Sequence, residues 1–336
     1  MSSLRQESTI PVHDNRAARL RGPSVWPWLE PSDHLGSLPT PSIDWPRISI
    51  VTPNFNYGHL IEMTMRSVIL QDYPNLEYIV IDDGSTDNSV ELIQKYSSKL
   101  AYFEHQPNQG QYPTINKGFS KATGEICAWL NSDDIYLPWT LRMVATVFLQ
   151  FPEVHWIAGR FTGIQDGVIH QIGGLRAFPR PMIRAGLFHD EGGGYGFIQQ
   201  ESCFWRRGLW ERAGGLKEDL RYAADFELWT RFAQYYDLHA VSTVLGGFSF
   251  RGNENRSRAN WQQFMDDVDK TVREIRRDRR STEARLARRI ALHEFIRYRV
   301  GRRIATRLFP VDDLRGPTLT WDFSQRRYVA GSARLF

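Results

Sequence analysis

The stretch Trp129-Leu130-Asn131-Ser132-Asp133-Asp134 and the earlier stretch Asp82-Asp83-Gly84-Ser85 decide the fold. Each follows directly on a short apolar run, which is 78–81 in one case and 126–130 in the other. Runs that are rich in β-branched residues and end in Asp, Asn, Gly or Ser are typical of buried parallel strands. The carboxyl ends of such strands meet in one crevice, where open α/β sheets bind their ligands. Because carboxylates brought together there repel each other unless a cation or ligand donors compensate them, the two stretches predict a site for a metal and a nucleotide.

Outward from these stretches, strands and helices alternate through residues 47–150. Apolar runs predict strands, and helical spacing predicts helices between them. This alternation implies a doubly wound, mainly parallel α/β sheet. The next hundred residues are less regular and we interpret them as the second half of the same domain. The predicted strands are 48–51, 77–81, 101–104, 126–130, 154–158 and 240–250, and the predicted helices are 60–71, 87–97, 113–122, 138–150, 206–213 and 225–236.

We expect three parts in the chain. Residues 1–46 hold seven of the 17 prolines and predict an extended or disordered segment, part of which docks onto the domain through tryptophans. Residues 47–257 form the α/β domain. Residues 258–336 form a basic helical extension that ends in a short strand or hairpin.

Composition narrows the class of protein. The chain has 336 residues and a net charge of +4, but residues 258–309 alone carry 15 Lys or Arg against 7 Asp or Glu. The main body is therefore slightly acidic, which argues against a nucleic-acid-binding surface. The two cysteines, Cys127 and Cys203, give no disulfide framework and are expected in the core of a protein from a reducing compartment. No stretch approaches the ~20 apolar residues that span a bilayer, so we expect a cytoplasmic protein, either soluble or peripheral on the inner face of the plasma membrane.

Five motifs occur in an order that is recognisable. Each is weak alone, since an Asp cluster in a loop is usually turn chemistry, but together they form a strong signal. They are 51–56 (VTPNFN), 82–87 (DDGSTD), 108–110 (NQG) with 116–118 (NKG), 130–134 (LNSDD), and 214–216 (GGL) followed by 224–229 (ADFELW).

From about Arg47 to Ser257 the chain resembles family 2 glycosyltransferases with the GT-A fold, of the bacterial kind that builds surface polysaccharides. The resemblance implies a Rossmann-like GT-A domain. It also implies transfer of a hexose from a UDP- or GDP-linked donor to a glycan or lipid-linked acceptor, with inversion at the anomeric carbon. The signature of processive synthases is missing, which favours the addition of a single sugar.

The resemblance implies a donor site around Asp83. This carboxylate would accept a hydrogen bond from a pyrimidine ring N–H, whereas Asp82 more simply caps the following turn. Phe55 would stack on the base, and the backbone around Pro53 would contact it. Asn131 stands where the family's DXD motif has its first carboxylate, and its amide would bond a ribose hydroxyl. The remaining donor-binding candidates are Asn56, Gly110, Asn116 and Ser132.

Asp133 matches the last position of the DXD motif and would bind Mg²⁺ or Mn²⁺. Such an ion takes one or two carboxylates plus substrate phosphates and, as a Lewis acid, neutralises charge on the departing nucleoside diphosphate. Asp134 is left open between a supporting acid and a helix cap. Many family members carry a His after the last strand, but this chain has Arg251 in that segment, where it would contact phosphate instead.

Asp225 is the candidate general base that would deprotonate the acceptor hydroxyl. Two alternatives stay open: Glu227 replaces it if the register slips, or Asp225 only caps the helix that follows. The glycine-rich segment 192–196 suggests a mobile lid near the site. Trp205, Trp210 and Trp229 are predicted to be core residues.

The C-terminal helices and the rival functions are also left open. Residues 286–309 repeat apolar residues at helical spacing with arginines between them, which fits an interfacial helix on an anionic membrane or a helix packed on the domain. A nucleotidyltransferase would need basic residues after the first strand to hold triphosphate, and 52–58 contains none. A non-catalytic binder of sugar nucleotides and a membrane-surface scaffold remain as alternatives.

Overall fold

Strands and helices alternate through the first half of the chain, as the sequence predicts. The computed structural model describes residue 27 and residues 44–165, 168–189, 195–252, 255–278, 280–299, 304, 307–308 and 315–334. Helix α4 begins two residues after Pro138, which we expected at its first position. The elements of this half are β1 (Ile48–Asn54), α1 (Ile61–Ile69), β2 (Leu76–Asp82), α2 (Ser89–Gln94), the 3-10 turn η2 (Ser97–Lys99), β3 (Tyr102–His105), α3 (Gln111–Lys121), β4 (Ile126–Trp129), β5 (Ile135–Tyr136) and α4 (Thr140–Gln150).

The second half has shorter and less regular elements, followed by helices and a hairpin. They are β6 (Trp156–Ala158), β7 (Thr162–Gln165), β8 (Val168–Ile172), α5 (Arg180–Arg184), the 3-10 turn η3 (Gln200–Ser202), β9 (Cys203–Arg206), α6 (Arg207–Ala213), α7 (Ala224–Tyr235), β10 (Leu238–Val241), β11 (Gly246–Ser249), α8 (Arg256–Ala259), α9 (Trp261–Ile275), α10 (Thr282–Arg299), β12 (Arg315–Asp322) and β13 (Arg327–Arg334).

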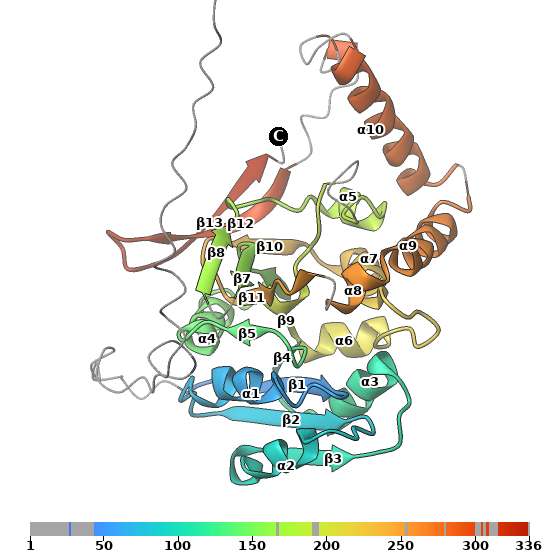
Figure 1. The fold of residues 1–336 in the computed structure, drawn as a ribbon. Helices are drawn as coiled ribbons and strands as arrows, with labels where there is room; N and C mark the ends of the chain where they lie inside the picture. The colour runs from blue at the N-terminus through green and yellow to red at the C-terminus, as the bar shows by residue number, and fades with distance from the viewer. Residues whose placement is uncertain are drawn as a thin grey trace, which may run out of the picture.

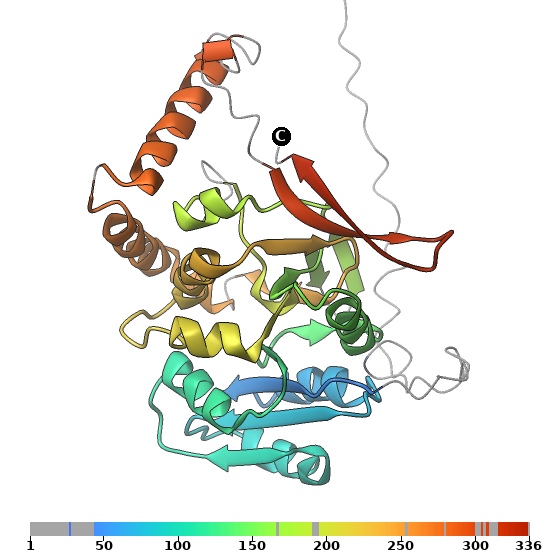
Figure 2. The same cartoon turned by 180° about the vertical axis from the view of Figure 1, so that it is seen from behind.

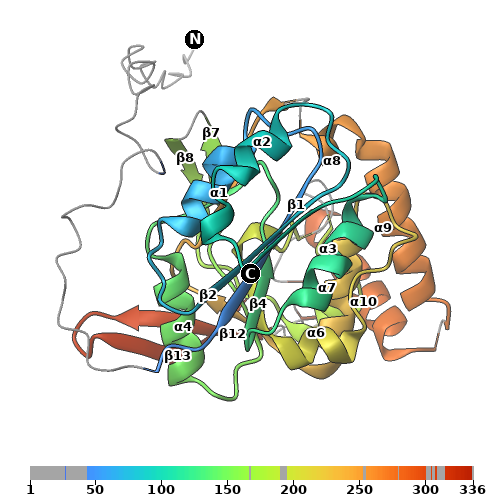
Figure 3. The same cartoon turned by 90° about the horizontal axis from the view of Figure 1, so that it is seen from below.

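One large sheet forms the centre of the molecule (Figures 1 and 2). Within the described chain its strand order is β13-β12-β10-β6-β9-β4-β1-β2-β3. The pairs are parallel except where β9 lies antiparallel between β4 and β6, and in the β12–β13 hairpin. Figure 3 shows α1 and α2 on one face of the sheet and α3, α6 and α7 on the other. Covering both faces explains why all seven residues of β1 are buried, and it confirms the predicted doubly wound α/β fold.

The strand register places the polar ends of three strands side by side. Asn54 at the end of β1 lies opposite Asp82 at the end of β2, and Val51 lies opposite Trp129 at the end of β4. The segments that follow β2 and β4 therefore leave the sheet at the same edge, next to the central strand. This is the edge at which a parallel sheet binds its ligands.

A second, small sheet has the order β5-β11-β7-β8 within the described residues. It was not predicted, because its strands have two to five residues and show no usable periodicity. The single strand predicted at 240–250 is in fact two strands in two sheets: β10 belongs to the large sheet and β11 to the small one. The small sheet adds aromatic side chains beside the crevice.

The C-terminal extension returns to the central sheet. Ala240 and Val241 of β10 pair with Thr318 and Leu319 of β12, so the predicted hairpin extends the sheet beyond the boundary expected at residue 257. Helix α10 buries Ala287 and Ile290 and leaves Phe295 exposed. One face of this helix is thus packed, in agreement with the alternative of a helix that packs on the domain. Among the described residues no helix is long and apolar enough to cross a membrane.

Four tryptophans fill the middle of the core. Trp129, Trp156, Trp205 and Trp229 are at most 2% exposed, and Trp229 stacks on Trp129 with ring centroids 5.9 Å apart. Trp210, which is 8% exposed, joins them, so the tryptophans predicted to be core residues are confirmed. Both cysteines are buried and free.

The beginning of the described chain docks onto the domain. Trp45 packs edge-on against Tyr73, and the carbonyl oxygen of Pro27 accepts a hydrogen bond from Arg66. The rest of the predicted N-terminal segment, and residues 192–194 of the predicted lid, lie outside the described residues.

Candidate active site

A cavity of about 1310 Å³ opens at the carboxyl ends of β1, β2 and β4. Asp83, Asp133 and Asp225 all line it, although they lie far apart in the sequence. The structure thus brings together the three carboxylates that sequence analysis assigned to the nucleobase (Asp83), the metal ion (Asp133) and the acceptor hydroxyl (Asp225). The other predicted site residues on its wall are Pro53, Phe55, Gly110, Asn131 and Ser132.

Asp83 is the most heavily hydrogen-bonded of the three. It is 3% exposed. Its Oδ1 accepts from the Gln106 side chain and the Gln109 amide, both at 2.9 Å, and its Oδ2 accepts from the Gly110 amide at 2.8 Å. Gly110 has a φ of 101°, which suits only glycine. Because a carboxylate has about four acceptor positions, Asp83 can fix the 106–110 loop and still accept one more hydrogen bond from a ligand.

Asp82 builds the turn, as predicted. It accepts from the amide and hydroxyl of Ser85, from Asn54 at 2.7 Å and from His105 at 2.7 Å. Asn56 belongs to the same framework, since its amide N–H donates to Ser85 and its Oδ1 accepts from the Thr86 amide. Asn56, although predicted to bind the donor, is not among the residues that line the cavity and instead holds the turn at Ser85 and Thr86.

Asn116 also lies away from the cavity wall. Its side chain bonds the backbone of Leu216 in both directions, at 2.9 Å each, and donates to Glu218 at 2.8 Å. It ties α3 to the loop after α6.

The residues expected near the base and ribose face the cavity. Phe55 is 45% exposed, so its ring is free to stack. Asn131 is held between two glutamines: its Oδ1 accepts from Gln111 at 2.9 Å, and its Nδ2 donates to Gln200 at 3.1 Å. Ser132 donates to the carbonyl oxygen of Pro53 at 2.6 Å and joins the β4 loop to β1.

Asp133 is paired with a cation from the other end of the domain. Arg251 donates to its Oδ2 and lies 5.3 Å from the centre of the Tyr57 ring. Arg251 is held in turn by Asn255, which accepts from its amide at 2.8 Å. The Asp133 side chain is 17% exposed, and burial raises its pKa, while Arg251 opposes that shift.

Two further carboxyl groups crowd the same wall. Burial and the neighbouring Asp133 raise the pKa of Asp134 well above its usual value. The Asp134 carboxylate accepts from the Ser249 amide at 3.0 Å, so it braces the small sheet and does not cap α4. Glu201 is 3% exposed, and burial raises its pKa to about 8. The family resemblance places residues 199–201 beside the acceptor but leaves open whether their side chains contact the sugar or end a strand; in the fold, Glu201 lines the cavity with Asp133 and Asp225.

Asp225 lies one residue inside helix α7. The residue before the helix is Ala223, and no side chain caps the helix there, so the capping alternative does not explain Asp225. Tyr112 fixes this end of α7 by accepting from the Ala224 amide at 3.2 Å. Burial raises the pKa of Asp225 to about 6. A carboxylate with a pKa near 6 is a stronger base than an exposed one and is still ionised at neutral pH.

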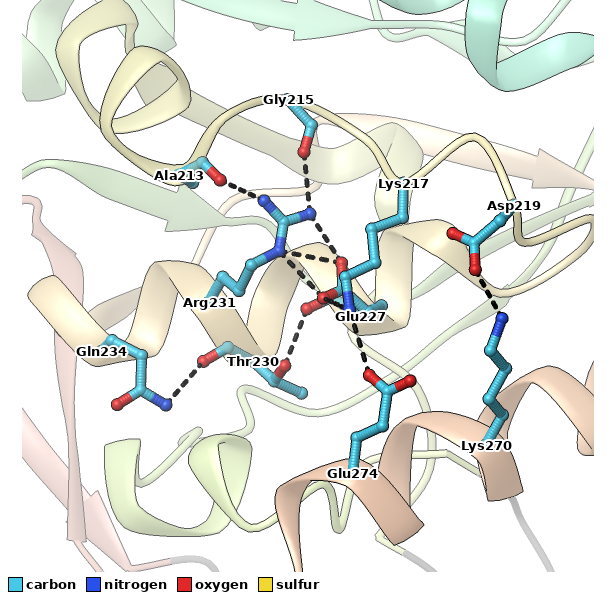
Figure 4. A network of polar contacts seen from close by, with 10 residues as sticks. All are labelled: Ala213, Gly215, Lys217, Asp219, Glu227, Thr230, Arg231, Gln234, Lys270 and Glu274. Carbon is cyan, nitrogen blue, oxygen red and sulfur yellow. Dashed lines mark hydrogen bonds and ion pairs between the residues drawn. The ribbon is translucent and has the colours of Figure 1, made fainter.

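Glu227 faces away from the cavity. Figure 4 shows it within a network of ion pairs, where Arg231 contacts both of its oxygens at 2.9 Å and Lys217 lies 3.1 Å away. Lys217 also bonds Glu274 of α9 at 3.1 Å. The network joins α7, α9 and the loop after α6, so Glu227 is a structural residue and not an alternative base.

The charge balance of the site fits a divalent ion held by a single protein carboxylate. Asp133, Asp134 and Glu201 influence one another's ionisation, while Arg251 supplies the positive charge beside Asp133. Among the described residues no three His, Cys, Asp or Glu side chains form a ready metal cage. Mg²⁺ commonly needs only one or two carboxylates when substrate phosphates complete its shell. Asp133 would therefore be the protein's ligand and would be shared with Arg251.

The sequence of this chain is similar to those of known glycosyltransferases. Residues 49–206 match the model of glycosyl transferase family 2. An uncharacterized glycosyltransferase of Nostoc sp. is 37% identical over 105 residues, which are 30% of this chain and 33% of that protein. One from Rickettsia typhi is 25% identical over 206 residues, which are 60% of this chain and 63% of that protein. The chain thus covers less than two thirds of the length of either relative.

Solved structures share the fold. The crystal structure of S. aureus TarS has a TM-score of 0.55 and 18% identity, covering 79% of this chain and 46% of TarS. A TarS fragment, residues 1–349 in complex with UDP-GlcNAc, has a TM-score of 0.54 and 18% identity, covering 75% of this chain and 81% of the fragment. At this identity the likeness concerns the fold alone.

Proposed function

We propose that this chain, a glycosyltransferase of family 2 over residues 49–206, moves a hexose from a nucleoside-diphosphate donor to a hydroxyl group of a glycan or lipid-linked acceptor. The observation that carries the proposal is the meeting of Asp83, Asp133 and Asp225 in one cavity. Asp83 would accept a hydrogen bond from the nucleobase, Asp133 would bind a cation, and the buried Asp225 would act as the general base of the transfer.

A UDP- or GDP-linked sugar is the proposed donor. The nucleobase would stack on the exposed ring of Phe55 and donate a ring N–H to the remaining acceptor position of Asp83. Asn131, fixed by Gln111 and Gln200, would bond the ribose. Because the TarS fragment with this fold binds UDP-GlcNAc, UDP-linked donors are the first to test.

Asp225 is proposed as the general base of an inverting displacement. The acceptor hydroxyl oxygen attacks the anomeric carbon, the bond from that carbon to the diphosphate oxygen breaks, and the hydroxyl proton passes to Asp225. The nucleoside diphosphate leaves from the opposite side of the ring. When bound at Asp133, Mg²⁺ or Mn²⁺ would neutralise the charge on the diphosphate. Arg251, at the same carboxylate, adds a fixed positive charge.

A role in surface polysaccharide synthesis at the inner face of the plasma membrane is proposed for the whole protein. The resemblance in the sequence supports the role. The exposed Phe295 of α10 and the basic residues around it support contact with an anionic membrane. Neither is required for the chemistry of the cavity.

A panel of nucleotide sugars tests the proposal. Preferential binding raises apparent stability by mass action, so the melting temperature with Mn²⁺ and each donor identifies the donor, and release of nucleoside diphosphate measures turnover. We expect one donor to stabilise the protein and to be consumed. Binding without any turnover would instead identify a non-catalytic sugar-nucleotide-binding protein.

A further inference from the structure

A cluster of aromatic side chains to which the proposed donor site assigns no role also lines the cavity. Phe197 is 37% exposed and Trp261 is 45% exposed, and both line the cavity together with Phe264. Trp261 stacks on Phe264 with centroids 5.3 Å apart and planes 16° apart, and Phe197 packs edge-on against both. A large flat ring that stays half exposed on a cavity wall leaves apolar surface available to a ligand.

Arginines accompany these rings. Arg160, Arg176, Arg256 and Arg258 line the same cavity, and none of them forms an ion pair with another described residue. Arg256 lies 5.0 Å from the centre of the Tyr222 ring and donates to Gln111 at 2.5 Å, and Arg258 lies over the ring of Phe250 at 4.7 Å. Their charges are therefore available to an anion, and a guanidinium group suits phosphate because it can donate two parallel hydrogen bonds.

Helix α9 joins this cluster to the proposed base. Asp267 of α9 accepts hydrogen bonds from the amides of Arg221 and Tyr222, at 2.8 Å each, just before α7 begins. Phe264 packs with Ala223 and Phe226 in one buried cluster, on either side of Asp225 in the sequence. The helix that carries Trp261 thus also fixes the end of α7 that carries Asp225. A ligand that stacks on Trp261 would therefore contact the same helix that fixes the position of the proposed general base, Asp225.

We propose that Trp261, Phe197, Arg256 and Arg258 form the acceptor subsite, which takes a sugar ring that carries a phosphate group. The ring stacks on Trp261 and the two arginines bind the phosphate. This inference rests on the proposed glycosyl transfer and adds the chemical class of the acceptor. The phosphate belongs either to a soluble phosphorylated saccharide or to a lipid diphosphate that carries a sugar.

Calorimetry on the full chain with saturating UDP, which fills the donor side, tests the subsite. The soluble probes are the 1-phosphates of glucose, galactose, mannose and N-acetylglucosamine, with the free sugars and inorganic phosphate beside them. The lipid probe is a farnesyl diphosphate-linked sugar in micelles. We expect a sugar phosphate to bind more tightly than its sugar or phosphate alone. The preferred probe form identifies the source of the phosphate.

The variants separate the two contacts. We expect Trp261→Ala to weaken sugar phosphate binding about tenfold, the scale of one lost aromatic contact, and Trp261→Phe to restore most of it. The double variant Arg256→Ala/Arg258→Ala should remove the preference for the phosphorylated sugar. Phe323→Ala and Arg285→Ala, at exposed positions outside the cavity lining, are the matched controls.

Two outcomes would overturn the subsite. One is that the wild type, Trp261→Ala and Arg256→Ala/Arg258→Ala bind sugar phosphates equally well. The other is that the protein binds phosphatidylglycerol vesicles instead of sugar phosphates, and that this binding depends on Trp261. Thermal stabilisation by the donor is measured on the same variants. If the wild type binds no nucleotide-sugar donor, the proposed function is refuted. If the wild type binds a donor but no sugar phosphate, only the acceptor subsite is refuted.

Discussion

The two sides of the cavity are built in different ways. On the donor side, Asp83 and Asn131 are polar groups fixed by several hydrogen bonds each, beside the exposed ring of Phe55. The other side, around Trp261, Arg256 and Arg258, consists of exposed rings and of cations that no described carboxylate neutralises. The first arrangement suits a ligand part that is common to many enzymes of a family. The second leaves shape and charge open to one particular acceptor.

The largest expected effect tests whether the transfer reaction depends on Asp225, which lines the same cavity. We expect Asp225→Asn to lower the rate of transfer by about 10²–10⁴-fold, the usual contribution of an aligned base. Thermal stabilisation by the donor should persist, because the amide keeps the shape of the side chain. Asp219→Asn, at an exposed ion pair with Lys270, is the control. Full activity of the Asp225 variant would remove the base from the mechanism.

Removal of divalent ions tests the proposal that Asp133 binds a metal ion. We expect EDTA to lower transfer on the order of 10²-fold, since a metal supplies several kcal/mol of charge stabilisation, and Mn²⁺ or Mg²⁺ to restore it. The measurement is initial rate against free metal concentration. Undiminished transfer in EDTA would show that Arg251 alone balances the diphosphate, and Arg251→Ala should then abolish donor binding.

Asp83 tests the claim that the donor side is fixed by hydrogen bonds. In Asp83→Asn, one oxygen is replaced by an NH₂ group, which faces either the Gly110 amide or the Gln109 amide and loses that hydrogen bond. Each lost bond to a charged group is worth about 1.5–3 kcal/mol, so donor affinity should fall about 10–100-fold. Titration of donor against melting temperature measures this, and affinity for sugar phosphates should not change. A variant with normal donor affinity would leave Asp83 only its role in the loop.

The smallest expected effect is on the pH profile. Because burial raises the pKa of Asp225 to about 6, the base is ionised above pH 6 and protonated below it. The rate of transfer at saturating substrates should therefore fall about tenfold from pH 7 to pH 5. Glu201 interacts electrostatically with this carboxylate, so the two carboxyl groups influence each other's titration. The residual rate of Asp225→Asn should lack this step, and a step that persists in it would assign the titration elsewhere.

The site residues that could be predicted from the sequence are those that directly follow a predicted strand. The strands before Asp83 and Asp133 have clear apolar runs, and a parallel strand directs its polar end to a known edge of the sheet. Motif membership alone was a weaker guide. Asn56 and Asn116 belong to recognised motifs, yet their side chains bond Thr86, Leu216 and Glu218 instead of facing the cavity. Which of two neighbouring polar residues faces a ligand depends on the turn that holds it.

The amino-acid sequence alone was enough to predict the doubly wound sheet, the acidic residues at the carboxyl ends of its strands, and a short strand or hairpin at the C-terminus, because apolar periodicity and strand-end polarity are local properties of a chain. The three-dimensional packing was needed to show that Arg251 pairs with Asp133, that Glu227 is held in an ion-pair network, and that Glu201 and Trp261 share the cavity with Asp225. These contacts join residues far apart in sequence. Their formation depends on how short strands and helices pack, and no local pattern encodes that packing.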